Sequence, residues 1–186
     1  ILALLRARTR QDFSGYKKPT VFRRIQRRMG LHQVNDLGSY ATLLRQSPGE
    51  AQQLADDLVI HVTGFFRDPE AWESLSERVI KPLVARKQPG ESIRVWVVAC
   101  AGGEEAYSLA MLLTEAAEEQ NKQLDIKIFA TDIADRMLLA ARTGTYTGGI
   151  ESEISLERLE RFFDKDDSVY HVKRELREMV IFAPQN

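Results

Sequence analysis

The stretch IRVWVVACAGGEEAYS, residues 93–108, decides the fold of this 186-residue chain. It opens with Ile93–Val98, a short apolar run rich in β-branched residues, which predicts a buried strand. Gly102-Gly103 then permits a tight turn, and a helix is predicted over 104–120. A second apolar run at 126–131 predicts another strand. Strand, turn, helix and strand form a βαβ unit, so the sheet is predicted to be parallel.

The glycine turn is a candidate ligand site, because ligands of parallel α/β sheets lie beyond the carboxyl ends of the strands. The turn lacks the G-x-G-x-x-G pattern, and the helix opens with Glu104 and Glu105. Carboxylates at a helix N-terminus complement the helix dipole and repel a phosphate. The pattern therefore disfavours a dinucleotide and favours a cofactor with an amino group and a sulfonium. A capped helix without any ligand explains the same residues equally well.

Asp132 ends the second predicted strand, about 30 residues after the glycine turn, where an acidic side chain suits the ribose hydroxyls of an adenosine. The alternative is a cap for the helix predicted over 135–142, a role that Asp135 could also fill. Together the turn and Asp132 indicate an adenosine-containing cofactor. They do not separate NAD from S-adenosylmethionine; only the glutamate pair does.

The rest of the chain divides into a helical first part and an α/β second part. Helical spacing of apolar residues predicts helices at 21–29, 37–44, 50–60 and 70–84. The segments 169–172 and 179–182 are predicted as two strands of a small antiparallel extension. We expect a small all-α domain over residues 1–62, followed by an incomplete Rossmann-like α/β domain over residues 63–186.

Charge is unevenly distributed along the chain. Residues 1–45 carry ten Lys or Arg against two acids, a net charge of +8, while the whole chain carries −1. Four arginines, Arg23, Arg24, Arg27 and Arg28, are predicted to share one broad helix face opposite Val21, Ile25 and Met29. This face is either a solvated surface, a docking site for an acidic protein helix, or a contact for nucleic-acid phosphates. The lack of interleaved aromatic residues disfavours nucleic acid.

Composition points to a cytoplasmic protein. No apolar stretch approaches the ~18 residues of a membrane span, and no signal peptide is recognisable. The single cysteine, Cys100, cannot form an internal disulfide or by itself supply a zinc site, which favours a reducing compartment. His32, His61 and His171 are isolated from one another, so no metal site is predicted. Because the first residue is Ile, the chain is expected to be part of a longer one.

Several segments together resemble the CheR-type chemotaxis protein methyltransferase family, and most closely the CheR modules of multidomain signalling proteins. In chain order they are DFSGYK at 12–17, the arginine helix at 23–29, VTGFFRDP at 62–69, RVW at 94–96, Cys100 with GEEAYS at 103–108, ATDI at 130–133, and FAPQN at 182–186. The combination of T-x-F-F-R-D, G-E-E-x-Y-S and T-D-I in this order is specific to the family.

The resemblance implies a cytoplasmic enzyme that uses S-adenosylmethionine to methyl-esterify glutamates on chemoreceptor signalling helices, releasing S-adenosylhomocysteine. The cofactor contacts that it implies are His61, Thr63, Arg67, Glu105, Asp132 and Asn186. Glu105 would meet the methionine end of the cofactor, Asp132 the ribose and Asn186 the region of the adenine. The arginines Arg23, Arg24, Arg27 and Arg28 would face the acidic receptor helices. No catalytic residue is assigned, since a glutamate is already ionised at neutral pH and needs no strong base.

The sequence departs from the family pattern at several positions. Ala99 and Gly102 stand where the family has Gly and Thr, Ala134 replaces the second acid of T-D-I-D, and Gln185 replaces a common His. His61 stands where the family has Asn or Ser. The family also continues past Asn186 with further strands, so we expect poor activity from these residues alone. The alternative is a non-catalytic receptor-docking or signalling module derived from such an enzyme.

Overall fold

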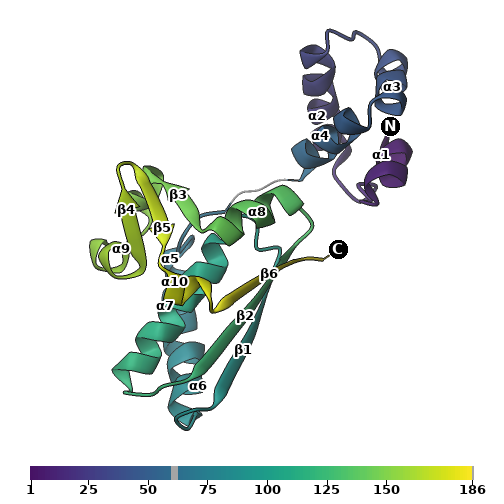
Figure 1. The fold of residues 1–186 in the computed structure, drawn as a ribbon. Helices are drawn as coiled ribbons and strands as arrows, with labels where there is room; N and C mark the ends of the chain where they lie inside the picture. Colours follow the sequence, from purple (N-terminus) through teal and green to yellow (C-terminus); the bar gives the residue numbers. More distant parts are fainter. Residues whose placement is uncertain (60–62, 186) are drawn as a thin grey trace. The chain divides into compact units, whose positions relative to one another are not determined.

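The computed structural model describes residues 1–59 and 63–185 and divides into two compact units, residues 1–60 and 61–186 (Figure 1). The domain boundary predicted after residue 62 falls at residues 60–62, which lie outside the described part. Each unit has its own hydrophobic core.

The first unit is all-α, as predicted. Its helices in the described part are α1 (Leu2–Thr9), α2 (Lys18–Leu31), α3 (Leu37–Gln46) and α4 (Pro48–Leu58). The core that they enclose consists of Leu5, Phe13, Val21, Ile25, Met29, Tyr40, Leu44, Ala51, Leu54, Ala55 and Leu58. Helix α1 was not predicted, because Leu5 is the one residue that it buries fully and it has no clear apolar stripe.

Helix α2 differs from its prediction in two ways. It begins at Lys18, with Pro19 in the first turn, where the missing N–H of proline costs nothing, and it continues through Gly30 to Leu31. Phe22, next to the buried Val21, is 47% exposed. Helix α3 begins where the Asp36 side chain accepts the backbone N–H of Ser39 at 2.9 Å, a capping bond that fixes its first turn.

The second unit is built on a parallel sheet, which confirms the predicted βαβ arrangement. Strand β2 (Asp125–Asp132) lies between β1 (Ser92–Val98) and β6 (Val180–Pro184), and both neighbours run parallel to it. Helix α7 (Glu104–Glu119) connects β1 to β2, and α8 (Asp135–Thr143) follows β2. Figure 1 shows α6 and α7 on one side of this sheet. Trp96 and Val98, at 58% and 61% exposed, point to the opposite side.

A small antiparallel sheet is also present, as predicted, but its membership differs. Its order is β3 (Thr145–Thr147), β5 (Val169–Val172), β4 (Phe163–Asp166), and the short helices η2 (Gly148–Ser152) and α9 (Leu156–Phe162) connect β3 to β4. The prediction that 179–182 pairs with 169–172 is wrong. After α10 (Arg174–Arg177) the chain enters the parallel sheet, where Val180 and Phe182 join the large core. Local sequence does not encode which sheet a short apolar run joins.

The helix predicted over 70–84 is a continuous but irregular one. It comprises α5 (Pro69–Leu75), the π-helical turn η1 (Ser76–Ile80) and α6 (Lys81–Arg86). Pro82 explains the irregularity, since proline has no N–H to donate and its ring clashes with the carbonyl four residues earlier. Accordingly, the N–H of Lys81 bonds the carbonyl of Ser76, five residues back. In the described residues, no helix has both the length and the hydrophobicity to cross a membrane.

Candidate functional site: the pocket beside the glycine turn

The glycine turn leaves β1 and enters α7 through an unusual backbone. Ala99, Ala101 and Gly103 all have positive φ, at 56°, 44° and 90°. A Cβ on Gly103 would lie 3.0 Å from the Cβ of Ala141 and from the ring of Phe182, so both the conformation and the space require glycine there. The turn is therefore closely packed against α8 and β6.

Asp132 lies at the end of β2, beside this turn, and is only 6% exposed. Its Oδ2 accepts the backbone N–H of Ala101 at 2.8 Å, and its Oδ1 accepts that of Ala134 at 2.9 Å. Asp132 thus fixes the glycine turn and the entry to α8 together. Each carboxylate oxygen has a second lone pair, so these bonds leave acceptor capacity for a ligand hydroxyl.

Three of the predicted cofactor residues line one pocket of about 350 Å³. They are Thr63 and Arg67, from the segment before α5, and Glu105, from the first turn of α7. Asp132 does not line this pocket but lies at the glycine turn, while His61 and Asn186 lie outside the described residues. Sequence reasoning missed the other lining residues, which are Gly64, Asp68, Ala71, Trp72 and Leu75.

The missed residues carried a recognisable signal. Asp68, Ala71, Trp72 and Leu75 are spaced i, i+3, i+4, i+7, which places them on one face of the helix that follows the Asp68-Pro69 turn. Because this helix face begins directly after Arg67, a predicted cofactor contact, its residues could have been predicted to line the same pocket.

The turn that carries Thr63 and Arg67 is anchored to α7. The backbone N–H of Phe66 donates to the Ser108 hydroxyl at 3.1 Å, and that hydroxyl donates to the carbonyl of Glu104 at 2.8 Å. Phe66 and Asp68 have positive φ, 48° and 58°, which is uncommon for residues other than glycine. The TGFFRD and GEEAYS motifs therefore meet in one local structure.

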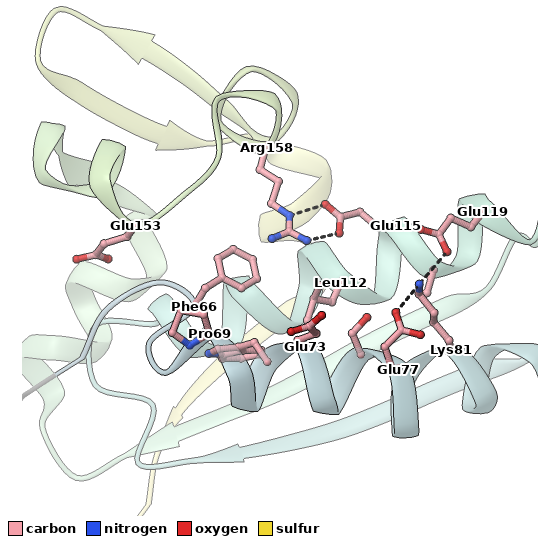
Figure 2. A pocket seen from close by; sticks show the side chains of 13 residues that line it. Phe66, Pro69, Glu73, Glu77, Lys81, Leu112, Glu115, Glu119, Glu153 and Arg158 are labelled. Carbon is pink, nitrogen blue, oxygen red and sulfur yellow. Dashed lines mark hydrogen bonds and ion pairs between the residues drawn. The ribbon is translucent and has the colours of Figure 1, made fainter.

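Figure 2 shows a second hollow, of about 500 Å³. Trp72 lines both hollows, and its ring packs edge-on against Phe66, at 5.6 Å between centroids. The rim carries several carboxylates, and Arg158 from α9 pairs with Glu115 while Lys81 pairs with Glu77 and Glu119. In the described part of the chain, no group of three or more His, Cys, Asp or Glu side chains could hold a metal ion.

The arginines of α2 do not share one surface. Arg23 and Arg27 are exposed and Arg24 is half-buried, whereas Arg28 is only 9% exposed. Arg28 donates to both carboxylate oxygens of the buried Glu50 on α4. The predicted four-arginine face is therefore wrong at Arg28, because residues at i and i+5 diverge around a helix with 3.6 residues per turn.

Comparison with known proteins identifies the family. Residues 61–186 match the family described as CheR methyltransferase, SAM binding domain, and residues 1–59 match its all-alpha domain. The chain belongs to the CheR methyltransferase family. The cofactor of its second domain is S-adenosylmethionine.

The chain is similar to named chemotaxis enzymes over most of its length. It is 33% identical over 176 residues to the chemotaxis protein methyltransferase Cher2 of Pseudomonas putida, covering 91% of this chain and 64% of that protein. It is 32% identical over 177 residues to the chemotaxis protein methyltransferase of Escherichia coli, covering 92% and 59%. It is 43% identical over 175 residues to an uncharacterised 104.1 kDa protein of Rhodobacter capsulatus, covering 94% and 18%. The chain thus spans less than two thirds of these relatives.

The charged side chains of the pocket that Thr63, Arg67 and Glu105 line fit S-adenosylmethionine. Arg67 and Glu105 present charges opposite to those of its carboxylate and amino groups, and both line the pocket with the Thr63 hydroxyl. Burial raises the pKa of the neighbouring Glu104, and the negative charge of Glu153 adds to this effect, against the hydrogen bond from Thr63.

Cys100, within the turn, is not a candidate nucleophile. It is buried, and burial followed by the charge of Asp132 raises the pKa of its thiol to about 12. The thiol therefore stays protonated at neutral pH, whereas nucleophilic cysteines act as thiolates.

The two departures from the family's G-C-x-T-G pattern have different structural consequences. Ala99 adopts a left-handed conformation with φ 56°, which explains why glycine suits this position. At Gly102, a Cβ would lie 2.8 Å from a carboxylate oxygen of Glu104. Glu104 therefore occupies space that a larger residue at position 102 would need.

Proposed function

We propose that this chain is the cofactor-binding part of an enzyme that methyl-esterifies glutamate side chains on chemoreceptor signalling helices. The observation that carries the proposal is the convergence of Thr63, Arg67 and Glu105 on one pocket beside the glycine turn. It is supported by the family membership of the chain and by the names of its relatives, which are chemotaxis protein methyltransferases.

Each residue of the site has a role in the proposal. Glu105 holds the amino group of the cofactor, Arg67 its carboxylate, and Asp132 the ribose, while Thr63 contributes a hydroxyl. His61 and Asn186 complete the proposed contacts from outside the described residues. Bound S-adenosylmethionine would supply a methyl group activated by its positive sulfur.

The chemistry asks the protein for positioning more than for a base. A glutamate substrate is ionised at neutral pH, so its carboxylate needs no deprotonation before it attacks the methyl group. Aligning the attacking oxygen, the methyl carbon and the leaving sulfur supplies most of the rate enhancement. Transfer forms a methyl ester and S-adenosylhomocysteine, and the positive charge of the sulfonium is lost.

The direct test is an ester assay with the full-length protein. It is incubated with S-adenosylmethionine labelled in the methyl group and with a receptor cytoplasmic fragment, and alkali-labile label is released as methanol. We expect labile label on the receptor fragment only when both are present. Absence of labile label would contradict the proposed activity. Receptor binding without label would instead support a non-catalytic docking module derived from such an enzyme.

We also propose that Arg23, Arg24 and Arg27 face the acidic receptor helices. Arg28 is left out of this set because it is buried. Replacing the three with Glu should abolish receptor pull-down at low salt, since charge pairs across such a surface steer and hold the partner. Unchanged pull-down would contradict the docking role.

A further inference from the structure

Tyr146, in the middle of β3, reaches out of the small antiparallel sheet to the glycine turn. Its hydroxyl donates to the carbonyl of Gly102 at 2.7 Å. Its ring packs edge-on against Phe65, with 4.8 Å between centroids, and against Tyr107 at 6.3 Å. Tyr146 therefore touches the GEEAYS side of the cofactor pocket and the TGFFRD side at once.

Glu153, just after η2 in the same β3-to-α9 connection, holds the TGFFRD turn. Its Oε2 accepts the backbone N–H of Phe65 at 2.7 Å. The same carboxylate lies so close to Gly64 that a Cβ there would be 3.1 Å from it. Phe65 and Gly64 stand directly after Thr63, so Glu153 fixes the backbone that presents the Thr63 hydroxyl to the pocket.

The aromatic packing makes this attachment rigid. Phe65 is 2% exposed and its ring also packs edge-on against Phe163 of β4, at 5.7 Å. On the other side of the turn, the guanidinium of Arg158 lies 4.4 Å from the ring centroid of Phe66. In Figure 2, Phe66, Glu153 and Arg158 lie around the same turn.

We infer that Tyr146 and Glu153 are positioning residues for the cofactor pocket. The short segment from Tyr146 in β3 to Glu153 after η2 bonds the two parts of the chain that carry the pocket-lining residues. It bonds the glycine turn that leads into Glu105, through Gly102, and the Thr63 turn, through Phe65. It thereby fixes the spacing between Glu105 and Thr63. A pocket whose walls are held before the ligand arrives loses less entropy on binding. The inference rests on the proposed function, because it assumes that this pocket holds S-adenosylmethionine.

The test uses four variants of the 186-residue chain in two matched pairs. Tyr146→Phe and Glu153→Ala remove the two bonds to the pocket walls. Tyr170→Phe and Glu151→Ala remove the hydrogen bond between Tyr170 of β5 and Glu151 of η2, which lies in the same part of the unit and contacts neither the glycine turn nor the Thr63 turn. The affinity for S-adenosylhomocysteine is measured by calorimetry, and thermal unfolding by circular dichroism.

Tyr146→Phe and Glu153→Ala should each weaken S-adenosylhomocysteine binding by about three- to tenfold, the worth of one hydrogen bond. The control variants should bind within about twofold of the wild type, even where their melting temperatures fall equally. Glu153→Gln should restore binding, because its amide oxygen can still accept the N–H of Phe65.

Three outcomes would overturn the inference. Wild-type affinity in Tyr146→Phe and Glu153→Ala would do so, and so would an equal loss in the control variants, which would mark a general effect of stability. A Glu153→Gln variant as weak as Glu153→Ala would show that charge acts rather than the bond. The wild-type measurement separates failure of this inference from failure of the proposed function. If the wild-type chain does not bind S-adenosylhomocysteine, both fail; if it binds and one of the three outcomes above is seen, only the inference fails.

Discussion

Arg28 of α2 and Glu50 of α4 form an ion pair inside the first unit, with the two residues 9% and 3% exposed. Arg28 Nε donates to Glu50 Oε1 at 2.9 Å, and Glu50 also accepts the Tyr40 hydroxyl at 2.6 Å and contacts His32 Nε2 at 2.6 Å. Burial alone would raise the pKa of Glu50, but the bonds from Arg28, Tyr40 and His32 outweigh it and lower that pKa below 4.5. Arg28 therefore joins two helices and is not part of a docking surface.

Arg28→Ala should destabilise the first unit by about 3 kcal/mol, because it leaves the Glu50 carboxylate buried without its cation. Arg27→Ala is the matched control. Arg27 is exposed and its guanidinium lies as far as 3.9 Å from the Asp57 carboxylate, so the loss of this weak ion pair should cost less than about 0.5 kcal/mol. Both tryptophans, Trp72 and Trp96, lie in the second unit. In Arg28→Ala, the urea unfolding transition followed by circular dichroism should therefore move to lower urea concentration. The transition followed by tryptophan fluorescence, which reports on the second unit, should not move. Equal effects of the two variants would contradict the structural role of Arg28.

Glu104 should make the second unit less stable as pH rises. Burial raises its folded-state pKa above 4.5, so the folded chain holds this proton more tightly than the unfolded chain. The resulting stability is fully present below pH 4.5 and is lost as pH increases through the raised folded pKa. Glu104→Gln removes this dependence.

The measurement is urea unfolding of the wild type and Glu104→Gln, followed by tryptophan fluorescence at pH 4.5 and 7.5. From pH 4.5 to 7.5 the wild type should lose the stability that protonated Glu104 contributes, whereas Glu104→Gln should not. The free energy of unfolding of the variant minus that of the wild type should therefore increase with pH. A difference in stability that does not change with pH would show that the raised pKa of Glu104 has no energetic consequence.

Ala99→Gly should stabilise the second unit by up to about 1 kcal/mol. Glycine relieves the left-handed conformation at φ 56°, a gain of about 1–2 kcal/mol that its greater freedom in the unfolded chain partly offsets. Ala85→Gly, in the exposed part of α6, is the control and should destabilise by about 1 kcal/mol. Urea unfolding that shows the same sign for both variants would contradict the role of backbone conformation at Ala99.

The core of the α/β unit could be predicted from sequence because its signals are local. The apolar run before Gly102, the helix opened by Glu104 and the second run ending at Asp132 each lie within one short window, and a βαβ unit admits few other arrangements. The small antiparallel sheet was also expected from the run at 169–172. Helix α1 was missed because it buries little. The predicted pairing of the 179–182 strand with 169–172 was wrong, because strand pairing depends on the whole sheet, in which β6 pairs with β2.

The site shows the same division between local and distant information. Thr63, Arg67 and Glu105 were found from motifs, and the structure places them around one pocket. The pairing of Arg28 with Glu50 spans 22 positions, and the bond from Phe65 to Glu153 spans 88. No periodicity or spacing in a single sequence indicates such contacts. Trp72, by contrast, was missed although its helical spacing from Asp68 was visible.

The most direct test of the cofactor site is calorimetric titration of S-adenosylhomocysteine into the 186-residue chain and its Glu105→Ala variant. Glu157→Ala, an exposed change in the first turn of α9, is the control. The proposed site predicts saturable one-site binding to the wild type and the control, weakened at least about tenfold in Glu105→Ala by loss of a charge-assisted hydrogen bond. Absence of binding to the wild type, or equal affinities of the wild type and Glu105→Ala, would contradict it.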